Sequence, residues 1–418
     1  MDELYPCCCG LDVHKSTVVA CLIRPGPDGT RVKETRTFAT TTDALEALRD
    51  WLVGAGCTHV AMESTGVYWK PIYNVLAATG SGLDARVVNA HHVKQIPGRK
   101  TDVKDAEWLA ILLQHGMLRA SYIPDQDQRE LRDLTRTRTS LTDERTAAVN
   151  RLHKVLEDAN IKLAGVASDV MGTSGRAILA ELVTGTMDPA AMAELAKGRL
   201  RTKRVELARA LSGRMREHHR ELVALHLSHI DFLDEAIADL DARIAEALRP
   251  FVDDLARLET IPGVKRLTAE VLAAEVGLGM APFASANHLA SWSGMAPGNN
   301  ESAGKRVRGK GRKGSRWLRR ALVQAAHAAA RTKRPGKTAL ADRYRRVVVR
   351  GGPKKAAMAV GRAILTTAYY LLTRQTTYTE PDPTTFNEGR RDRIKRRAVD
   401  QLASLGYHVT LAPKQEAA

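Results

Sequence analysis

Hydrophobic and polar positions in the first 122 residues follow two different periods. Apolar or alternating runs of strand length predict five strands, at Tyr5–Leu11, Thr17–Ile23, Arg31–Phe38, His59–Met62 and Ala85–Val88. Apolar residues at helical spacing predict three helices, at about Thr42–Val53, Tyr68–Ala78 and Asp102–His115. Three antiparallel strands followed by alternating helices and strands therefore open the chain as an α/β unit.

This order of elements narrows the fold. A simple doubly wound sheet does not begin with two hairpins, whereas a ribonuclease-H-like sheet does. Residues 1–122 are therefore predicted to form a ribonuclease-H-like domain in which the first and fourth strands are neighbours.

Residues 123–250 change to a pattern rich in Arg, Glu, Leu and Ala, with few turn signals. Leucines from Leu131 to Leu156 fit one long amphipathic helix, and a second long helix is predicted from about Arg201 to Leu248, before Pro250. We expect an antiparallel helical hairpin or coiled coil with a shorter helical insert, of the kind that spaces domains or pairs subunits.

Residues 251–374 are predicted to be a compact helical domain. The run Leu258–Val264, with Leu267 after it, resembles a helix-hairpin-helix, where a turn at Gly263 would present backbone N–H groups to a phosphate. An ordinary turn between two helices is the alternative. A loop at Gly298–Gly314 precedes three more helices, at about Ser315–Arg331, Thr338–Val349 and Pro353–Thr373. The predicted fold class is thus α/β plus all-α, with a polar tail at 375–418.

Composition sets limits on the class of protein. The 418 residues are 44% hydrophobic, which excludes a wholly disordered chain. No stretch is long and apolar enough to span a membrane, and the first residues do not resemble a secretory signal. Five cysteines, three of them consecutive, do not have metal-ligand spacing and indicate buried thiols in a reducing cytoplasm.

Positive charge is concentrated in one stretch. The formal net charge is +17, and the window from Ser302 to Arg350 holds seventeen Lys or Arg and one acid, Asp342. Such a stretch indicates a polyanionic partner, of which nucleic acid fits best. A solvated face or a membrane-surface helix is the alternative, and the scarcity of apolar anchors disfavours the membrane.

Four acids are candidate metal ligands. Asp12 and Glu63 follow the predicted first and fourth strands, and Asp102 and Asp105 are one helical turn apart, so the four carboxylates are expected to converge. Converged carboxylates need cations, and a pair of Mg²⁺ ions would suit an in-line phosphoryl displacement. Taken singly, each acid has a structural explanation: a helix-dipole partner, a turn residue, or an ion pair of Glu63 with Lys15 or Lys70.

Ser302 lies in the basic, glycine-rich loop and is a candidate nucleophile for a phosphodiester. A hydrogen-bonding loop serine is the alternative, and Ser315, just before a helix, is better interpreted as an N-cap. The candidate nucleic-acid-binding residues are Lys305, Arg306, Arg308, Lys310, Arg312, Lys313, Arg316, Arg319, Arg320 and Gly263.

Together these motifs resemble one family. Gly-Leu-Asp-Val-His-Lys, Met-Glu-Ser-Thr-Gly-Val-Tyr-Trp and Lys-Thr-Asp-Val-Lys-Asp-Ala, followed by Ile-Pro-Gly-Val, Ser-Gly-Met-Ala-Pro, Glu-Ser-Ala-Gly-Lys and Gly-Ser-Arg-Trp-Leu-Arg-Arg, are similar to the DEDD transposases of bacterial insertion sequences. This is the insertion-sequence family numbered one hundred and ten. The resemblance covers about residues 7–374.

The resemblance implies a mechanism. It implies a RuvC-like N-terminal domain whose metal ligands match Asp12, Glu63, Asp102 and Asp105, and a catalytic serine that matches Ser302 in the C-terminal transposase domain. It further implies recombination of double-stranded donor and target DNA through a covalent 5′-phosphoserine link. A structured bridge RNA would select both DNAs, and a homo-oligomer, dimer or tetramer, would act in the bacterial cytoplasm at the nucleoid.

Two other functions remain open from the sequence. A RuvC-like, structure-specific endonuclease would cut DNA by hydrolysis, form no covalent adduct and not need Ser302. A non-catalytic nucleic-acid scaffold would keep its cellular activity after Asp102→Asn. The absence of a P-loop motif fits a transesterification that conserves phosphodiester energy.

Overall fold

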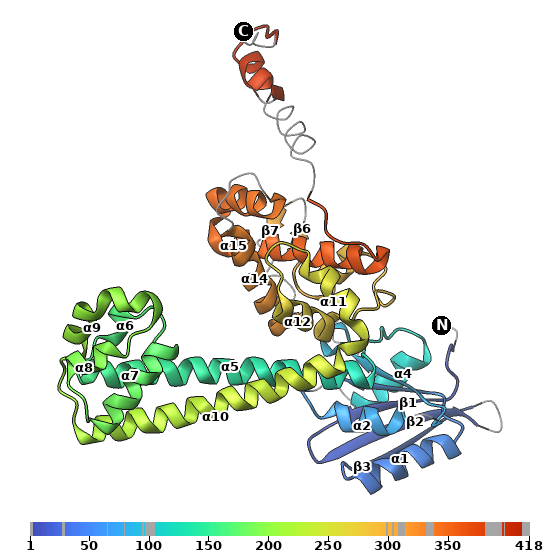
Figure 1. The fold of residues 1–418 in the computed structure, drawn as a ribbon. Helices are drawn as coiled ribbons and strands as arrows, with labels where there is room; N and C mark the ends of the chain where they lie inside the picture. Colours follow the sequence, from blue (N-terminus) through green and yellow to red (C-terminus); the bar gives the residue numbers. More distant parts are fainter. Residues whose placement is uncertain are drawn as a thin grey trace. The chain divides into compact units, whose positions relative to one another are not determined.

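The structure, a computed structural model, describes residues 3–26, 30–64, 66–78, 80–93, 96, 105–297, 300–302, 305–307, 314–331, 338–380, 395–396 and 398–411, with side chains at all of these except 91, 300–302 and 305–307. The chain divides into two compact units, Met1–Pro124 and Asp125–Ala418 (Figure 1). Each unit has its own hydrophobic core.

The N-terminal unit is built on a mixed sheet, which has five strands among the described residues, in the order β3-β2-β1-β4-β5. The strands are β1 (Cys8–Val13), β2 (Thr17–Pro25), β3 (Arg31–Ala39), β4 (His59–Glu63) and β5 (Asp84–Val88). The pairs β1–β2 and β2–β3 are antiparallel, whereas β4 is parallel to both β1 and β5. The prediction that the first and fourth strands are neighbours is confirmed.

Helices cover both faces of this sheet, because successive side chains in a strand point to opposite faces. Cys9 and Leu11 of β1 belong to the core under α1 (Thr42–Gly54) and α2 (Trp69–Leu76). Cys8 of β1 and Ala61 of β4 belong to the core under α4 (Asp105–Gln114). A short helix, α3 (Ala90–Val93), follows β5. The predicted helices are all found, within a few residues at their ends.

The second unit begins with the predicted helical hairpin, formed by α5 (Gln126–Asp158) and α10 (Glu217–Ala247). Ion pairs join Arg138 to Asp241, Arg145 to Asp234 and Asp158 to His219. Because the numbers rise along one helix and fall along the other, the two helices are antiparallel. The predicted helical insert lies between them, and we call it the lobe: α6 (Leu163–Val166), α7 (Thr173–Thr184), α8 (Pro189–Glu194), the 3-10 helix η1 (Gly198–Lys203) and α9 (Arg204–Leu211).

The prediction of one helix from Arg201 to Leu248 is wrong. The chain leaves the helix after Leu211 and re-enters it at Glu217. At the break, a Cβ on Gly213 would lie 2.5 Å from the carbonyl oxygen of Ala159, so the backbone packs there too closely for another residue. The Arg214 N–H also donates to that carbonyl at 2.8 Å. Tertiary packing has therefore overridden the helical pattern.

The C-terminal helices are η2 (Arg249–Phe251), α11 (Val252–Glu259), α12 (Arg266–Val276), α13 (Ala286–Trp292), α14 (Arg316–Ala330) and α15 (Ala339–Arg374). Non-helical Gly352, with φ of 77°, interrupts α15 just before Pro353, where the sequence predicted a gap between two helices. The predicted loop at Gly298–Gly314 instead contains a short antiparallel hairpin of β6 (Asn300–Ser302) and β7 (Lys305–Val307).

Candidate active site and nucleic-acid interface

Asp12 and Glu63 lie side by side at the carboxyl ends of two parallel strands. Leu11 of β1 is in register with Met62 of β4, and the two acids are the next residues along each strand. Neighbouring strands are about 4.8 Å apart. By alternation, Asp12 shares the face of Cys8 and Gly10, and Glu63 shares the face of Ala61, so both carboxylates belong to the face that α4 covers.

Asp105 is the first residue of α4, and the sequence at Gly10 brings this helix close to the sheet. A Cβ on Gly10 would lie 2.2 Å from the carbonyl oxygen of Ala106 and 2.4 Å from the amide nitrogen of Ala110. Only glycine permits this approach. Asp105 directly precedes the point of contact and lies on the same side of the sheet as Asp12 and Glu63. The fourth predicted ligand, Asp102, lies outside the described residues.

The Asp12 carboxylate keeps 31% of its side-chain surface exposed and contacts His14, with 3.2 Å between Oδ2 and Nε2. Glu63 is half-buried and Asp105 is exposed. Three carboxylates that are accessible on one face offer hard oxygen ligands, the donor type that Mg²⁺ prefers. Sequence reasoning did not include His14 in the site, although its position two residues after Asp12 puts both on one side of an extended chain.

A hollow of about 340 Å³ opens beside this edge of the sheet. It is lined by Val88, the register partner of Glu63 on β5, and by side chains of α3 and of the segment after α4, among them His92, Met117 and Arg119.

Ser302, the predicted nucleophile, is the last residue of β6, and its backbone pairs with Lys305 of β7. The side chains of Ser302, Lys305 and Arg306 are not described. Arg308, Lys310, Arg312 and Lys313 lie outside the described residues. The prediction for Ser315 is confirmed, because its hydroxyl accepts a hydrogen bond from the Leu318 N–H at 3.2 Å and caps α14.

Three predicted phosphate ligands start α14. Arg316 is exposed, with its guanidinium 4.5 Å from the ring centre of Trp317. Arg319 is half-buried. Arg320 forms a bidentate ion pair with Asp143 of α5, which holds the pKa of that carboxyl below its usual value. Arg320 therefore joins α14 to the hairpin, a role that the sequence did not predict.

Gly263 lies in the turn between α11 and α12, with φ of 89°. A Cβ there would lie 2.3 Å from the carbonyl oxygen of Ala325 in α14, so the turn packs tightly against that helix. This close contact accounts for the glycine whether or not the turn binds phosphate. Its predicted contact with nucleic acid stays a prediction.

A buried ionic network fixes the hairpin to the C-terminal helices. Arg138 of α5, 5% exposed at its side chain, reaches Glu270 of α12 at 2.5 Å and Asp241 of α10 at 2.8 Å. Arg136 makes two hydrogen bonds to the buried carboxylate of Glu275, which raise the pKa of Arg136 above its ordinary value. Because Glu270 and Glu275 are both in α12, the network holds this helix against the hairpin.

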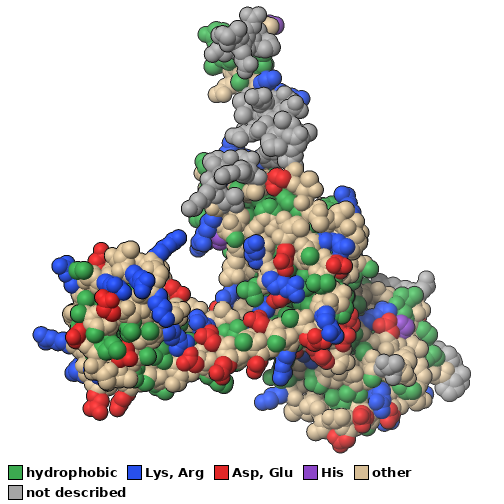
Figure 2. Space-filling model, in the orientation of Figure 1, with side chains coloured by type: hydrophobic (Ala, Val, Ile, Leu, Met, Phe, Trp, Pro, Cys, Tyr) green, Lys and Arg blue, Asp and Glu red, His purple; other side chains and the backbone are tan. Residues whose placement is uncertain are grey.

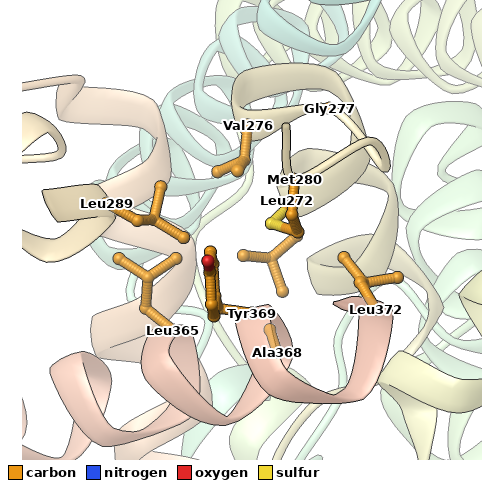
Figure 3. Close-up of a pocket in the computed structure, with 9 residues that line it drawn as sticks. All are labelled: Leu272, Val276, Gly277, Met280, Leu289, Leu365, Ala368, Tyr369 and Leu372. Carbon is orange, nitrogen blue, oxygen red and sulfur yellow. The ribbon is translucent and has the colours of Figure 1, made fainter. Parts of the chain in front are cut away.

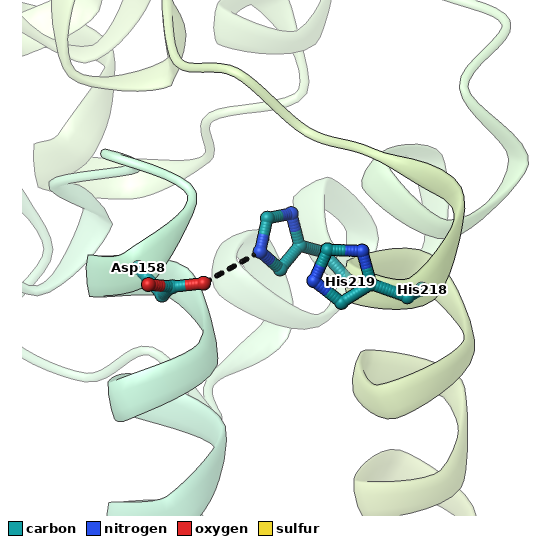
Figure 4. Close-up of side chains that lie close together, drawn as sticks. All are labelled: Asp158, His218 and His219. Carbon is teal, nitrogen blue, oxygen red and sulfur yellow. Dashed lines mark hydrogen bonds and ion pairs between the residues drawn. The ribbon is translucent and has the colours of Figure 1, made fainter.

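One further side-chain cluster within the described residues has the composition of a metal site: Asp158, His218 and His219 (Figure 4). His219 is buried, and both of its ring nitrogens are used. Nδ1 accepts the Arg216 N–H at 3.2 Å, so Nε2 carries the proton and donates to Asp158 at 2.8 Å. A metal at Nε2 would move the ring proton to Nδ1, which could then no longer accept the Arg216 N–H that caps α10. We therefore assign this cluster a structural role.

The apolar cavity drawn in Figure 3 is also no ligand site. Side chains of α12, α13 and α15, including Leu272, Leu289 and Tyr369, converge on it, and its volume is only about 10 Å³. The Tyr369 hydroxyl points to the carbonyl oxygen of Phe283 and donates to it at 3.1 Å. No helix within the described residues is both long and apolar enough to cross a membrane.

Comparison with known proteins agrees with these observations. Residues 9–161 match the DEDD transposase model of IS110, and residues 255–341 match the model described as "Transposase IS116/IS110/IS902 family". A transposase for insertion sequence element IS1111A from Coxiella burnetii is 26% identical over 327 residues, which are 77% of this chain and 79% of that protein. A probable family 20 transposase from Pseudomonas aeruginosa is also 26% identical, over 76% of this chain and 85% of its own.

Both relatives are described as transposases, and the Coxiella protein as one for an insertion sequence element. The first family model covers the sheet that carries Asp12 and Glu63. The second covers the helices α11 to α14 and the β6–β7 strands between them. The chain belongs to the IS110 family of insertion-sequence transposases.

Proposed function

We propose that this transposase cuts and rejoins DNA by magnesium-assisted transesterification, with Ser302 as nucleophile and Asp12, Glu63, Asp102 and Asp105 as metal ligands. The observation that carries the proposal is the register of β1 and β4, which puts two carboxylates side by side on the face that α4 covers. The strand order, with three antiparallel strands before two parallel ones, supports a RuvC-like, ribonuclease-H-like unit.

The residues fit the metal. The proposed ligands are all carboxylates, and Asp12 and Glu63 lie on a rigid strand pair while Asp105 begins a helix. Carboxylate oxygens with room for water are the ligands that Mg²⁺ takes. Two bound ions would supply Lewis acidity toward the attacking and leaving oxygens of a phosphodiester.

The covalent step conserves the number of phosphodiester bonds. The Ser302 Oγ attacks phosphorus, an O–P bond to serine forms, and the P–O3′ bond breaks. The serine proton ends on the 3′ oxygen, which leaves as a free hydroxyl. A 3′-hydroxyl of a second strand then attacks the phosphoserine and releases Ser302. The cations near Ser302 would stabilise the charge on the phosphoryl oxygens.

The proposal assigns a task to each segment. Residues 1–122 hold the metals, 123–250 form the helical hairpin and lobe, 251–374 carry the serine and bind nucleic acid, and 375–418 are a tail. Double-stranded DNA is donor and target, and a bridge RNA selects both. A dimer or tetramer is proposed because recombination of two duplexes needs several active sites.

The test compares two serines. Ser302→Ala should abolish recombination and the covalent protein–DNA adduct, while binding of nucleic acid persists. Ser315→Ala removes only an N-cap, which costs about 1 kcal/mol, so the adduct should still form. Denaturing gels with and without protease show the adduct directly. Recombination by Ser302→Ala at the wild-type rate would exclude this nucleophile.

A hydrolytic RuvC-like endonuclease is the second candidate, because the acids alone suffice for water attack. It predicts cut DNA without an adduct and no effect of Ser302→Ala. Both candidates predict loss of cutting in Glu63→Gln. A non-catalytic scaffold would instead keep its cellular activity in this variant.

A further inference from the structure

A second basic segment lies in the lobe, far along the chain from Ser302. Residues 197–216 contain eight Lys or Arg and one acid, Glu206, a net charge of +7. They form η1, α9 and the turn that leads into α10. The proposed chemistry gives this charge no role.

Most of these cations have no acidic partner. Arg204 pairs with Glu194 at 2.9 Å, and Arg216 lies near Asp158. The other six are exposed and form no ion pair with any acid in the described part of the chain. We call them the basic lobe surface: Lys197, Arg199, Arg201, Lys203, Arg209 and Arg214. Figure 2 shows Lys and Arg side chains projecting from the lobe.

Elsewhere in the same unit, several arginines have acidic partners. Arg138 and Arg145 of α5 and Arg176 of α7 each pair with an acid of α10. Among the described cations of η1 and α9, Arg204 alone has an acidic partner. Unpaired like charges at this density repel one another, so they are best explained by a polyanion that binds there.

The backbone under the basic lobe surface is fixed. The Lys197 N–H donates to the Ser174 hydroxyl at 2.9 Å, the Lys162 N–H donates to Ala210 at 2.8 Å, and the Arg214 N–H donates to Ala159 at 2.8 Å. Leu207 of α9 is fully buried in the lobe core. The cations are therefore held on a framework and need little ordering to meet a rigid partner.

We propose that the basic lobe surface binds the phosphate backbone of double-helical DNA that flanks the recombination site. Residues 197–216 contain no aromatic side chain on which unpaired bases would stack, which argues against a single-strand site. Lys and Arg contacts to phosphate position a duplex without reading its bases. The identity of the duplex as DNA rests on the proposed function.

The position of the lobe suits flanking DNA. Arg138 on α5 contacts α12, and Asp158 at the other end of α5 lies beside the lobe. These twenty residues span about 30 Å of helix, at 1.5 Å per residue. That length corresponds to roughly nine base pairs at 3.4 Å each. A duplex held at the C-terminal helices has to extend at least that far to reach the lobe.

The test uses the full chain and a 40-base-pair DNA duplex. The triple variant R199Q/R201Q/R209Q is compared with K154Q/R243Q/R249Q, which removes three exposed cations outside the basic lobe surface. Each lost phosphate contact lowers the slope of log affinity against log salt by about 0.9, so the lobe variant should lose about 2.7. Between 50 and 200 mM salt its affinity should then fall about 40-fold less than that of the wild type.

A third variant, R199K/R201K/R209K, keeps the charge and should keep the wild-type slope. A wild-type slope in R199Q/R201Q/R209Q, or an equal loss in the control variant, would overturn the proposal. So would a loss confined to an RNA duplex of the same length. A chain that binds DNA through the lobe but forms no serine adduct would refute the proposed chemistry and leave this inference standing.

Discussion

Gly10→Ala should separate α4 from the sheet. The added Cβ would lie 2.2 Å from the Ala106 oxygen and 2.4 Å from the Ala110 nitrogen, and both are backbone atoms of a helix. Contacts of this kind are comfortable near 3.5 Å, so the helix has to move by roughly 1 Å. Neither atom can turn aside as a flexible side chain would.

The cost follows from what α4 buries. Leu109, Leu112 and Leu113 pack under this helix against Cys8 and its neighbours. A gap of 0.5–1 Å forfeits a quarter to a half of each contact energy. Overpacking of a core costs about 1–3 kcal/mol, and we expect the upper end here because the clash is with backbone.

Hydrogen exchange read by mass spectrometry is the suitable assay, because it reports the N-terminal unit separately from the rest. A loss of about 3 kcal/mol should speed exchange of the α4 amides about 100-fold. Gly54→Ala is the matched control: Gly54 ends α1 with no atom near its Cβ position, so alanine should be neutral or stabilise by up to about 1 kcal/mol. Wild-type exchange in Gly10→Ala would refute the close approach. If Asp105 holds metal, Gly10→Ala should also weaken Mg²⁺ binding.

Two further predictions concern other parts of the chain. The neighbouring Cys57 thiol and the charge of Arg24 lower the pKa of Cys7 to about 7, so Cys7 should be alkylated at pH 7, while Cys9, whose pKa is raised by burial, should not. Cys57→Ala should slow the reaction of Cys7 severalfold, and equal labelling of Cys7 and Cys9 by mass spectrometry would contradict this. Arg138→Met should cost about 1.5–3 kcal/mol, because the buried Glu270 loses one charged hydrogen bond but keeps the one from Arg266 at 2.9 Å, and adding Glu270→Leu should recover part of it; additive losses in urea unfolding would show that the pair is not coupled.

The placement of Asp12 beside Glu63 could be predicted because it follows from local periodicity. Alternation in a strand puts Asp12 on the face of Gly10, and the same rule puts Glu63 on the face of Ala61. The pairing of the first strand with the fourth was then predicted from the order of strands and helices along the chain. The depth of the α4 contact was not predicted, although a glycine inside a strand is a known sign of close backbone approach.

Two elements were not predicted correctly: the break between α9 and α10, and the β6–β7 hairpin. The periodicity of residues 201–248 is helical, yet Gly213 packs against Ala159 and breaks the helix. The β6–β7 hairpin has only three residues per strand, too few for an alternating pattern to stand out among glycines and cations. In the first case the deciding partner is distant in sequence, and in the second the strands are too short for their alternation to be recognised.

The basic lobe surface shows why charge has to be counted over short segments of the sequence and then compared with the ion pairs of the fold. Residues 123–250 contain twenty Lys or Arg and twenty-one acids, so as a segment they look balanced. Folding distributes that balance unevenly, because the acids of α10 pair with arginines of α5 and α7. The acids of α10 that form these ion pairs do not pair with the cations of η1 and α9, which keep a net positive charge. The net charge of +7 at residues 197–216 is visible in a short window of the sequence but is hidden in the balance of residues 123–250. The ion pairs of the folded chain then show which of these cations have no acidic partner among the described residues.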